Sequence, residues 1–201
     1  MYQLIESIKV LNNRLYNLSY HQRRIQRSVV ELYGRKDHCI SFNELQKEAL
    51  NLDNKVLYKL RVEYNDTEYK HEFLPYKKRE IQSLKVIEDE TIDYSLKYSD
   101  RDRLYEHFNN KGDSDDILIT VNGGVTDTYY CNVAFKKNGQ WFTPDMPLLM
   151  GTKRQQLIDE LLITPKEIFV EDIPEYEKIC LFNAMIDFGE TVFEVGHIDL
   201  G

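Results

Sequence analysis

The sequence predicts an α+β fold, and three observations lead to that prediction. Residues 55–64 alternate strictly between two faces, as the residues of a half-buried strand do. Turns rich in glycine and asparagine at 122–124 and 137–139 separate further strand-like runs. Apolar residues have helical spacing at 19–33 and 152–162, but these segments do not alternate regularly with strands as in a parallel βαβ fold.

The N-terminal part contains the elements of a small domain. A strand is expected at 3–10, then a helix that begins after Ser19 as N-cap and ends at Gly34. A short helix from Ser41 to about residue 51, with Glu44 completing a capping box, precedes the strand at 55–64 and its return strand at 68–76. The basic run at 77–80 follows Pro75 and interrupts the apolar pattern, which predicts two domains, 1–78 and 79–201.

The second part is expected to be larger and richer in strands. Its helices are predicted from about 100 to 109 and from 152 to 162. The strands are predicted at 82–96, 116–121, 125–135, 140–143, 167–171, 177–186 and 191–199.

Composition excludes several classes of protein. The 201-residue chain is 42% hydrophobic and 30% charged, as globular and not disordered proteins are. No apolar run approaches the ~20 residues of a membrane helix, and residues 1–14 lack a signal-peptide pattern, so we expect a cytoplasmic protein without a membrane partner. Three cysteines without a CxxC pair and five dispersed histidines predict neither a disulfide framework nor a metal site.

Charge is unevenly distributed along the chain. Residues 1–40 contain seven Lys or Arg and three acids, whereas residues 155–201 contain two Lys and eleven acids. A basic patch on an acidic chain of net charge −8 suits a small anionic ligand better than nucleic acid, which needs an extended positive face. The alternative is a solvated helix face that packs near the acidic half.

Two segments have the residues of an anion site. Gly151 precedes Thr152 and Lys153 at the start of an amphipathic helix, where unpaired N–H groups and the helix dipole favour a phosphate. Earlier in the chain, either Arg24 or Arg27 could point inward and bind phosphate with its planar guanidinium. The alternatives are a helix start without a ligand and a helix with surface arginines.

Lys97 and Asp127 are the candidates for covalent and acid–base chemistry. Lys97 lies between a strand and a helix, where burial would favour the neutral amine that forms a Schiff base; a solvated lysine is the alternative. Asp127 stands among apolar and aromatic residues, and a buried carboxylate there needs a cationic partner. A protonated pyridine nitrogen would be one, and a local turn hydrogen bond is the alternative.

In their order and spacing, these segments resemble the class IV, or fold type IV, pyridoxal-phosphate enzymes. That family includes branched-chain and D-amino-acid aminotransferases and aminodeoxychorismate lyase, and the resemblance covers about residues 5–188. It implies a two-domain fold similar to D-amino acid aminotransferase, with a small α/β N-terminal domain and a larger pseudo-barrel C-terminal domain. It also implies pyridoxal 5′-phosphate as the cofactor and a homodimer.

The family's motifs imply roles for residues of this chain by position. The HxxRxxxS motif places Arg24 at the cofactor phosphate, and K-x-x-[DN]-R begins at Lys97, which resembles the Schiff-base lysine. The segment 125–132 is similar to [VI]-[ST]-[ED]-x-x-x-x-N, and Asp127 stands where an acidic residue pairs with the pyridine nitrogen. The helix start is similar to L-x-G-x-[TR]-R. The cofactor-binding residues that these motifs imply are Arg24, Lys97, Asp127, Thr128, Asn132, Gly151, Thr152 and Lys153.

The lysine motif looks closer to the lyases of the family than to its branched-chain transaminases. The resemblance therefore implies an enzyme similar to 4-amino-4-deoxychorismate lyase, which releases pyruvate and 4-aminobenzoate for folate biosynthesis. The alternatives are a class IV amino acid transaminase and a non-catalytic relative that binds pyridoxal phosphate or another phosphate. The enzyme alternatives share a small-molecule amino substrate as partner.

Two features depart from the family's usual pattern. Asp127 stands where Glu is more common, and the N-terminal residues that usually precede the strand at Ile5 are missing. Those residues usually help to wall the pocket and to build the dimer. Ser7 stands where some lyases have a threonine near the cofactor, and Tyr58 or Arg61 could bind a substrate carboxylate.

Overall fold

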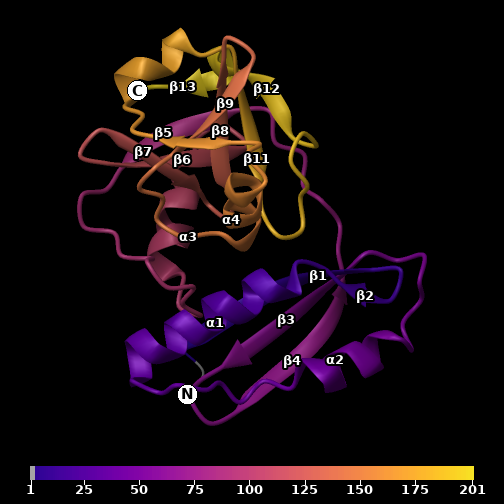
Figure 1. The fold of residues 1–201 in the computed structure, drawn as a ribbon. Helices are drawn as coiled ribbons and strands as arrows, with labels where there is room; N and C mark the ends of the chain where they lie inside the picture. The colour runs from indigo at the N-terminus through magenta and orange to yellow at the C-terminus, as the bar shows by residue number, and fades with distance from the viewer. Residues whose placement is uncertain (1–2) are drawn as a thin grey trace. The chain divides into compact units, whose positions relative to one another are not determined.

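The computed structural model describes residues 3–201, which divide into two compact units (Figure 1). The first unit extends to Lys78 and also includes Leu96–Asp100, and the second comprises Arg79–Ser95 and Arg101–Gly201. Residues 96–100 therefore pack with a unit whose other residues come much earlier in the sequence. That residues 1–78 and 79–201 are functional domains stays a prediction.

The first unit is built on a four-stranded antiparallel sheet of order β2-β1-β3-β4. Residues 96–100 lie along the N-terminal end of β1, where Leu4 forms a bridge with Tyr98. The strands are β1 (Leu4–Leu11), β2 (Arg14–Leu15), β3 (Tyr58–Tyr64) and β4 (Tyr69–Pro75).

Two helices, α1 (Leu18–Tyr33) and α2 (Phe42–Ala49), pack on the sheet of the first unit (Figure 1). The side chains of β3 alternate between two faces, as the sequence predicted, and the face with Leu60, Val62 and Tyr64 is buried. These residues share one hydrophobic core with apolar residues of β1 and both helices. The opposite face of the strands carries mainly charged side chains, which keeps it polar.

The ends of these helices differ from the prediction. Helix α1 has Asn17 as its N-cap, with φ 56°, and Ser19 lies inside the helix, so the predicted N-cap was wrong. Asparagine tolerates this left-handed backbone better than most residues, which explains its place there. Ser41 does occupy the N-cap of α2, but its side chain forms no capping hydrogen bond.

The second unit is a mainly antiparallel nine-stranded sheet of order β10-β9-β8-β7-β6-β5-β13, with β11 between β8 and β12. Its strands are β5 (Leu84–Glu88), β6 (Asp116–Val121), β7 (Gly124–Thr128), β8 (Asn132–Lys137), β9 (Gln140–Pro144), β10 (Thr164–Lys166), β11 (Lys178–Phe182), β12 (Val192–Glu194) and β13 (Ile198–Asp199).

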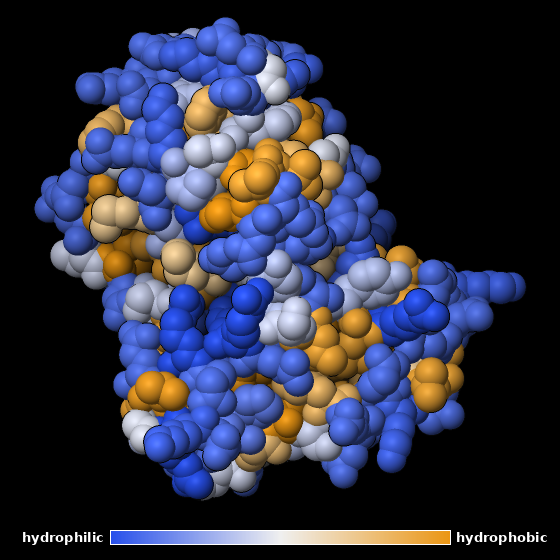
Figure 2. Space-filling model, viewed as in Figure 1, coloured by the Kyte–Doolittle hydropathy of each residue, from blue (hydrophilic) through white to orange (hydrophobic). Residues whose placement is uncertain are grey.

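Helices α3 (Asp102–Asn109) and α4 (Thr152–Asp159), with 3-10 helices η1 (Val170–Glu175) and η2 (Val195–His197), complete the second unit. Its main core is formed by apolar side chains of the central strands, and a smaller core lies under α4 at Leu157. The face shown in Figure 2 is mostly hydrophilic, with several separate hydrophobic groups. Within residues 3–201, no helix has the length and apolar character needed to cross a membrane.

Several strand predictions in the second unit were wrong. The predicted strand 82–96 ends at Glu88, and η2 interrupts the predicted strand 191–199. The run 125–135 is divided between β7 and β8, because residues 128–131 form a tight turn: Thr128 N–H donates to Cys131 C=O, and Cys131 N–H donates to Thr128 Oγ1. The predicted strand 167–171 is replaced by β10 and η1, where Phe169 N–H donates to Asp172 Oδ2 at 2.9 Å. Apolar runs alone do not reveal such side-chain-stabilised turns.

Candidate active site

Arg24 lies on the buried side of α1, where a carboxylate holds it. Its Nε donates to Glu6 Oε1 at 2.7 Å, and its Nη2 donates to Glu6 Oε2 at 2.5 Å. Glu6, on β1, is fully buried, and Arg24 is only 7% exposed. Of the two arginines that the sequence left open, Arg24 therefore points inward and Arg27 is exposed.

His21 completes this buried cluster. Its Nδ1 lies 2.7 Å from Glu6 Oε2, and its ring is fully buried. Burial opposes ionisation of Glu6, but the charge of Arg24 and the hydrogen bonds from His21 and Arg24 outweigh it and lower the pKa of Glu6 to about 2. Burial lowers the pKa of His21; Glu6 opposes this shift, and the charges of Arg24 and Lys97 add to it. Glu6 is thus ionised and His21 neutral near pH 7.

Lys97 belongs to the first unit and is half-buried. Its backbone C=O accepts a hydrogen bond from Ile5 N–H at 2.9 Å, next to Glu6 in the chain. Its side-chain charge lowers the pKa of the same buried His21 ring that Glu6 contacts. Two residues expected at opposite ends of a cofactor, Lys97 and Arg24, therefore lie in one unit and act on one ring.

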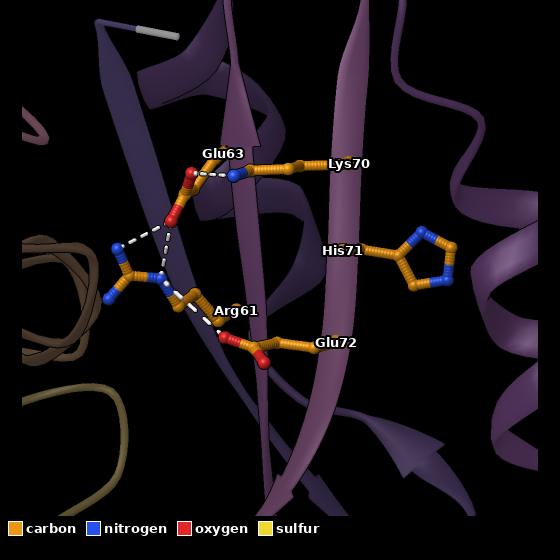
Figure 3. A pocket seen from close by; sticks show the side chains of 5 residues that line it. All are labelled: Arg61, Glu63, Lys70, His71 and Glu72. Carbon is orange, nitrogen blue, oxygen red and sulfur yellow. Dashed lines mark hydrogen bonds and ion pairs between the residues drawn. The ribbon is translucent and has the colours of Figure 1, made fainter.

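Arg61, expected to bind a substrate carboxylate, is paired with carboxylates of the protein (Figure 3). Its Nε and Nη2 donate to Glu63 Oε1 at 2.9 and 2.6 Å, and its Nε lies 3.8 Å from Glu72 Oε1. Lys70 Nζ lies 2.8 Å from Glu63 Oε2. With His71, which points to the other side of β4, these side chains line a pocket of 160 Å³. A substrate carboxylate at Arg61 would have to compete with Glu63 and Glu72.

The other two substrate candidates lie on different faces of the same sheet. Ser7 is opposite Arg61 in the register of β1 and β3, so the two side chains share the polar face. Tyr58 is opposite Val10 and packs against the core of the first unit. The structure therefore brings Ser7 and Arg61 together and places Tyr58 apart from them.

Asp127 and Asn132 hold the loop that precedes α4. Asp127 Oδ1 accepts a hydrogen bond from Asn132 Nδ2 at 2.7 Å, and Asp127 Oδ2 accepts one from Leu149 N–H at 2.8 Å. Asn132 Nδ2 also donates to Leu149 C=O at 2.9 Å. Both oxygens of Asp127 therefore have partners within the protein, one on Asn132 and one on the backbone of Leu149, 22 residues away in the sequence.

Gly151 is the N-cap of α4 and lies against Asn132. A Cβ atom on Gly151 would lie 1.8 Å from Asn132 Oδ1, although φ −66° is open to any residue. Space, and not backbone conformation, therefore requires glycine here. Thr152 is buried at the first helical position, and the Lys153 Nζ lies 2.9 Å from Asp187 Oδ1.

Arg154 is a buried residue of this region that sequence reasoning did not single out as a site residue. It is buried, and its Nη2 donates to Pro144 C=O at 2.7 Å, across the base of the loop 145–151. Burial lowers the pKa of Arg154, and the negative charges of Asp127 and Asp145 oppose this shift. The sequence signal that could have identified Arg154 is its position as the last arginine of the L-x-G-x-[TR]-R pattern.

Glu6 was also missed, and its only signal was position. In a strand, Glu6 shares a face with Leu4 and Ile8. Its carboxylate is therefore expected to be buried and to need a cationic partner. Thr128, expected to bind the cofactor, directs its hydroxyl to the 128–131 turn. Within residues 3–201, no group of three or more His, Cys, Asp or Glu side chains could hold a metal ion.

Comparison with known proteins identifies the family. Residues 94–189 match the family described as amino-transferase class IV. A Haemophilus influenzae protein, named “Uncharacterized protein”, is 36% identical over 187 residues, or 92% of this chain and 98% of that one. A crystal structure from Haemophilus somnus, described as a “putative 4-amino-4-deoxychorismate lyase”, is 35% identical, with a TM-score of 0.86 over 92% of this chain and 97% of that chain. The chain belongs to the class IV aminotransferases.

The fold is the fold type IV architecture of class IV aminotransferases and lyases, as the sequence predicted. A Mycobacterium tuberculosis protein, a “hypothetical aminotransferase” in its PLP-bound form, has the same fold with a TM-score of 0.79 at 13% identity. That match covers 98% of this chain and 81% of the other. The class IV family is dependent on pyridoxal phosphate.

Proposed function

We propose that this class IV protein binds pyridoxal 5′-phosphate covalently through Lys97 and acts as a lyase on an amino-bearing substrate. The substrate we propose is 4-amino-4-deoxychorismate, with pyruvate and 4-aminobenzoate as products, in folate biosynthesis. The observation that carries the proposal is the start of α4. There the backbone at Gly151 leaves no room for a side chain, and the adjoining loop is fixed by Asp127 and Asn132.

The residues of this helix start fit a phosphate. The first N–H groups of a helix lack intrahelical acceptors and carry the positive end of its dipole. The amides of Thr152 and Lys153 would hold phosphate oxygens, and the guanidinium of Arg24 would bind another. Arg24 supports this role because it is buried with a fixed orientation, and planar guanidinium groups suit phosphate.

Bound pyridoxal phosphate supplies an electron sink for negative charge that develops at a substrate's α-carbon. Asp127 would hold a proton at the pyridine nitrogen. A carboxylate has about four acceptor positions, so Asp127 can accept that hydrogen bond beside those from Asn132 and Leu149. Lys97 Nζ, once released by the incoming substrate amine, would move the α-proton as general base and acid.

A class IV amino acid transaminase is the second candidate. The family description names aminotransferases, whereas the Haemophilus somnus relative at 35% identity is described as a lyase. Both reactions need Lys97, so we propose that the residues that bind the substrate determine whether the protein acts as a lyase or as a transaminase. Ser7 and Arg61, which share the polar face of the first sheet, are the residues we propose there, and Tyr58 is the weaker candidate.

Further proposals follow from family membership. We propose that the protein works in the cytoplasm as a homodimer, that its partner is a small amino substrate, and that residues 1–78 and 79–201 act as its two domains. Sedimentation equilibrium of the purified chain measures the subunit number directly.

A spectrum and a trapping reaction test the cofactor proposal. Purified protein supplied with pyridoxal phosphate should be yellow, and borohydride should remove the absorbance band and attach the cofactor's mass to the Lys97 peptide. Lys97→Ala should lose the band, whereas the control Lys55→Ala, at an exposed lysine, should keep it. A colourless protein, or mass on another lysine, would contradict the proposal. Pyruvate release without a keto-acid acceptor separates the lyase from the transaminase.

A further inference from the structure

The buried cluster of Glu6, His21 and Arg24 has no part in the proposed proton transfers. Glu6 and His21 are fully inaccessible to solvent, and Arg24 is almost so. Each oxygen of Glu6 accepts a hydrogen bond from Arg24, and Oε2 is also hydrogen-bonded to His21. Burying charged groups is costly unless they are paired with good geometry, so such a cluster calls for a functional reason.

We propose that Glu6 is a positioning residue that fixes the guanidinium plane of Arg24, and that His21 couples this pair electrostatically to Lys97. The consequence at the phosphate rests on the proposed function, whereas the coupling within the cluster does not. No motif of the sequence includes Glu6.

Geometry supports the positioning role. Two donors of Arg24, Nε and Nη2, are fixed by the two oxygens of one carboxylate. Because the guanidinium is planar, this fork-to-fork contact sets the direction of its remaining donors. Glu6 is itself set by β1, which has hydrogen-bonded neighbours on both sides, with β3 on one and residues 96–100 on the other.

The groups that face the cluster determine its charge. Tyr64 on β3 is buried beside Glu6 and Arg24, and burial followed by the charge of Glu6 raises its pKa, so it stays neutral. Glu6 and Arg24 balance each other. Lys97 is a further charged group that acts on His21, and its backbone C=O accepts a hydrogen bond from Ile5 N–H, next to Glu6. His21 therefore reports on the charges of Glu6, Arg24 and Lys97.

The ionisation of His21 tests the coupling without any cofactor. We would follow the His21 ring signals by NMR from pH 4 to 9 in the purified full chain. Arg24→Gln should raise the pKa of His21 by about one unit or more, because it removes a repelling cation and leaves Glu6 unbalanced. Lys97→Met should raise it in the same direction, and Glu6→Gln should lower it. The control Lys55→Met should leave it unchanged.

Each outcome decides part of the proposal. An unchanged His21 pKa in Arg24→Gln would refute the cluster, and an unchanged value in Lys97→Met would refute the link to Lys97. If the chain takes up no pyridoxal phosphate, the proposed function fails, but these titrations still decide the coupling.

A double-mutant cycle on pyridoxal phosphate affinity tests the positioning role. Glu6→Gln should weaken binding by about tenfold or more, as the loss of a charged hydrogen bond does. Combined with Arg24→Gln, it should weaken binding little beyond Arg24→Gln alone, because Glu6 acts through Arg24. Independent, multiplying losses would refute the role. If Glu6→Gln does not fold, Glu6→Asp, which keeps the charge but shortens the reach, replaces it in the cycle.

Discussion

At the scale of single residues, the approach of two backbone segments decides what Gly151 must be. Two hydrogen bonds hold the loop before α4 close to Asn132: Leu149 N–H donates to Asp127 Oδ2, and Asn132 Nδ2 donates to Leu149 C=O. Asn132 Oδ1 then lies so close to the Cα of Gly151 that no side chain larger than a hydrogen atom fits there. Asp127, Asn132 and Gly151 thus depend on one another's positions, and a substitution at any of them is expected to shift the others.

Gly151→Ala should destabilise the protein by about 1–3 kcal/mol, because the added methyl group overlaps Asn132 Oδ1. It should also weaken pyridoxal phosphate binding, since the start of α4 must move. Urea unfolding and cofactor titration measure the two effects. The matched control is Gly196→Ala, where a Cβ meets nothing within 4 Å. Equal effects of the two substitutions would contradict the steric explanation.

At the scale of elements, Asp89 connects the end of β5 to α3. Its carboxylate accepts hydrogen bonds from Arg103 Nε and Nη2, both at 2.8 Å, and lies 2.5 Å from His107 Nε2. Thr91 N–H and Oγ1 also donate to it, which closes the loop after β5. One nearly buried side chain therefore joins a strand end, a loop and a helix.

Asp89→Asn should cost about 2–3 kcal/mol of stability at neutral pH, the size of one or two hydrogen bonds to a charged group. Hydrogen bonds from Arg103, His107 and Thr91 hold the pKa of Asp89 well below its usual 3.8. A lowered pKa stabilises the fold above pH 3.8, and this contribution is lost as the pH falls below that value. Urea midpoints of both proteins from pH 7 to 3 should therefore converge on acidification.

A control at the same loop sharpens this test. Asp93 is exposed, and its Oδ1 accepts hydrogen bonds from Ser95 N–H and Oγ. Asp93→Asn should therefore cost less than Asp89→Asn. A larger loss at Asp93, or a pH-independent difference at Asp89, would show that Asp89 does not tie the elements together.

Much at this scale could be predicted from sequence, because strands with alternating faces and glycine turns carry local signals. The strand at 116–121 has the predicted bounds, and β3 shows the predicted alternation between two faces. Local patterns failed where a side chain ends an element, as Thr128 does between β7 and β8. The predicted helix 152–162 ends earlier, at Asp159, and Leu161 beyond it adopts a positive φ of 58°.

The candidate site divides in the same way. Motif spacing predicted Arg24, Asp127 and Gly151 as members of one site, which stays a prediction, and the structure shows each at a buried, constrained position. Their partners Glu6 and Arg154 could not be ranked, because the need for a partner appears only when burial is known. The distribution of charge along the sequence did not reveal that Glu6, one of few acids in a basic segment, balances Arg24.

At the scale of the whole molecule, the three cysteines report on different parts of the chain. Cys39 is half-buried in the first unit, whereas Cys131 and Cys180 are buried in the second. Burial raises the pKa of all three thiols, that of Cys180 to about 11. Thiolates are the reactive form, so exposure decides the order of reaction.

Ellman's reagent should therefore modify Cys39 first in the native protein, and the other two only on the timescale of opening of the second unit. In denaturant all three should react at once. Cys39→Ser should remove the early phase and leave the slow one unchanged. An early phase that persists in this variant would mean that the second unit opens more readily than its burial implies.

The short return of residues 96–100 to the first sheet affects how the chain can be cut. The polypeptide crosses between the two units three times, so no single cleavage separates them intact. A fragment that stops at residue 78 would leave Ile5 N–H and Gln3 C=O without the partners that they have at Lys97 and Ser99. Uncovered strand edges recruit other strands, so such a fragment would tend to self-associate. During translation, the edge of β1 likewise stays unpaired after residue 78 has been synthesised, until about twenty further residues have been added and residues 96–100 can pair with it.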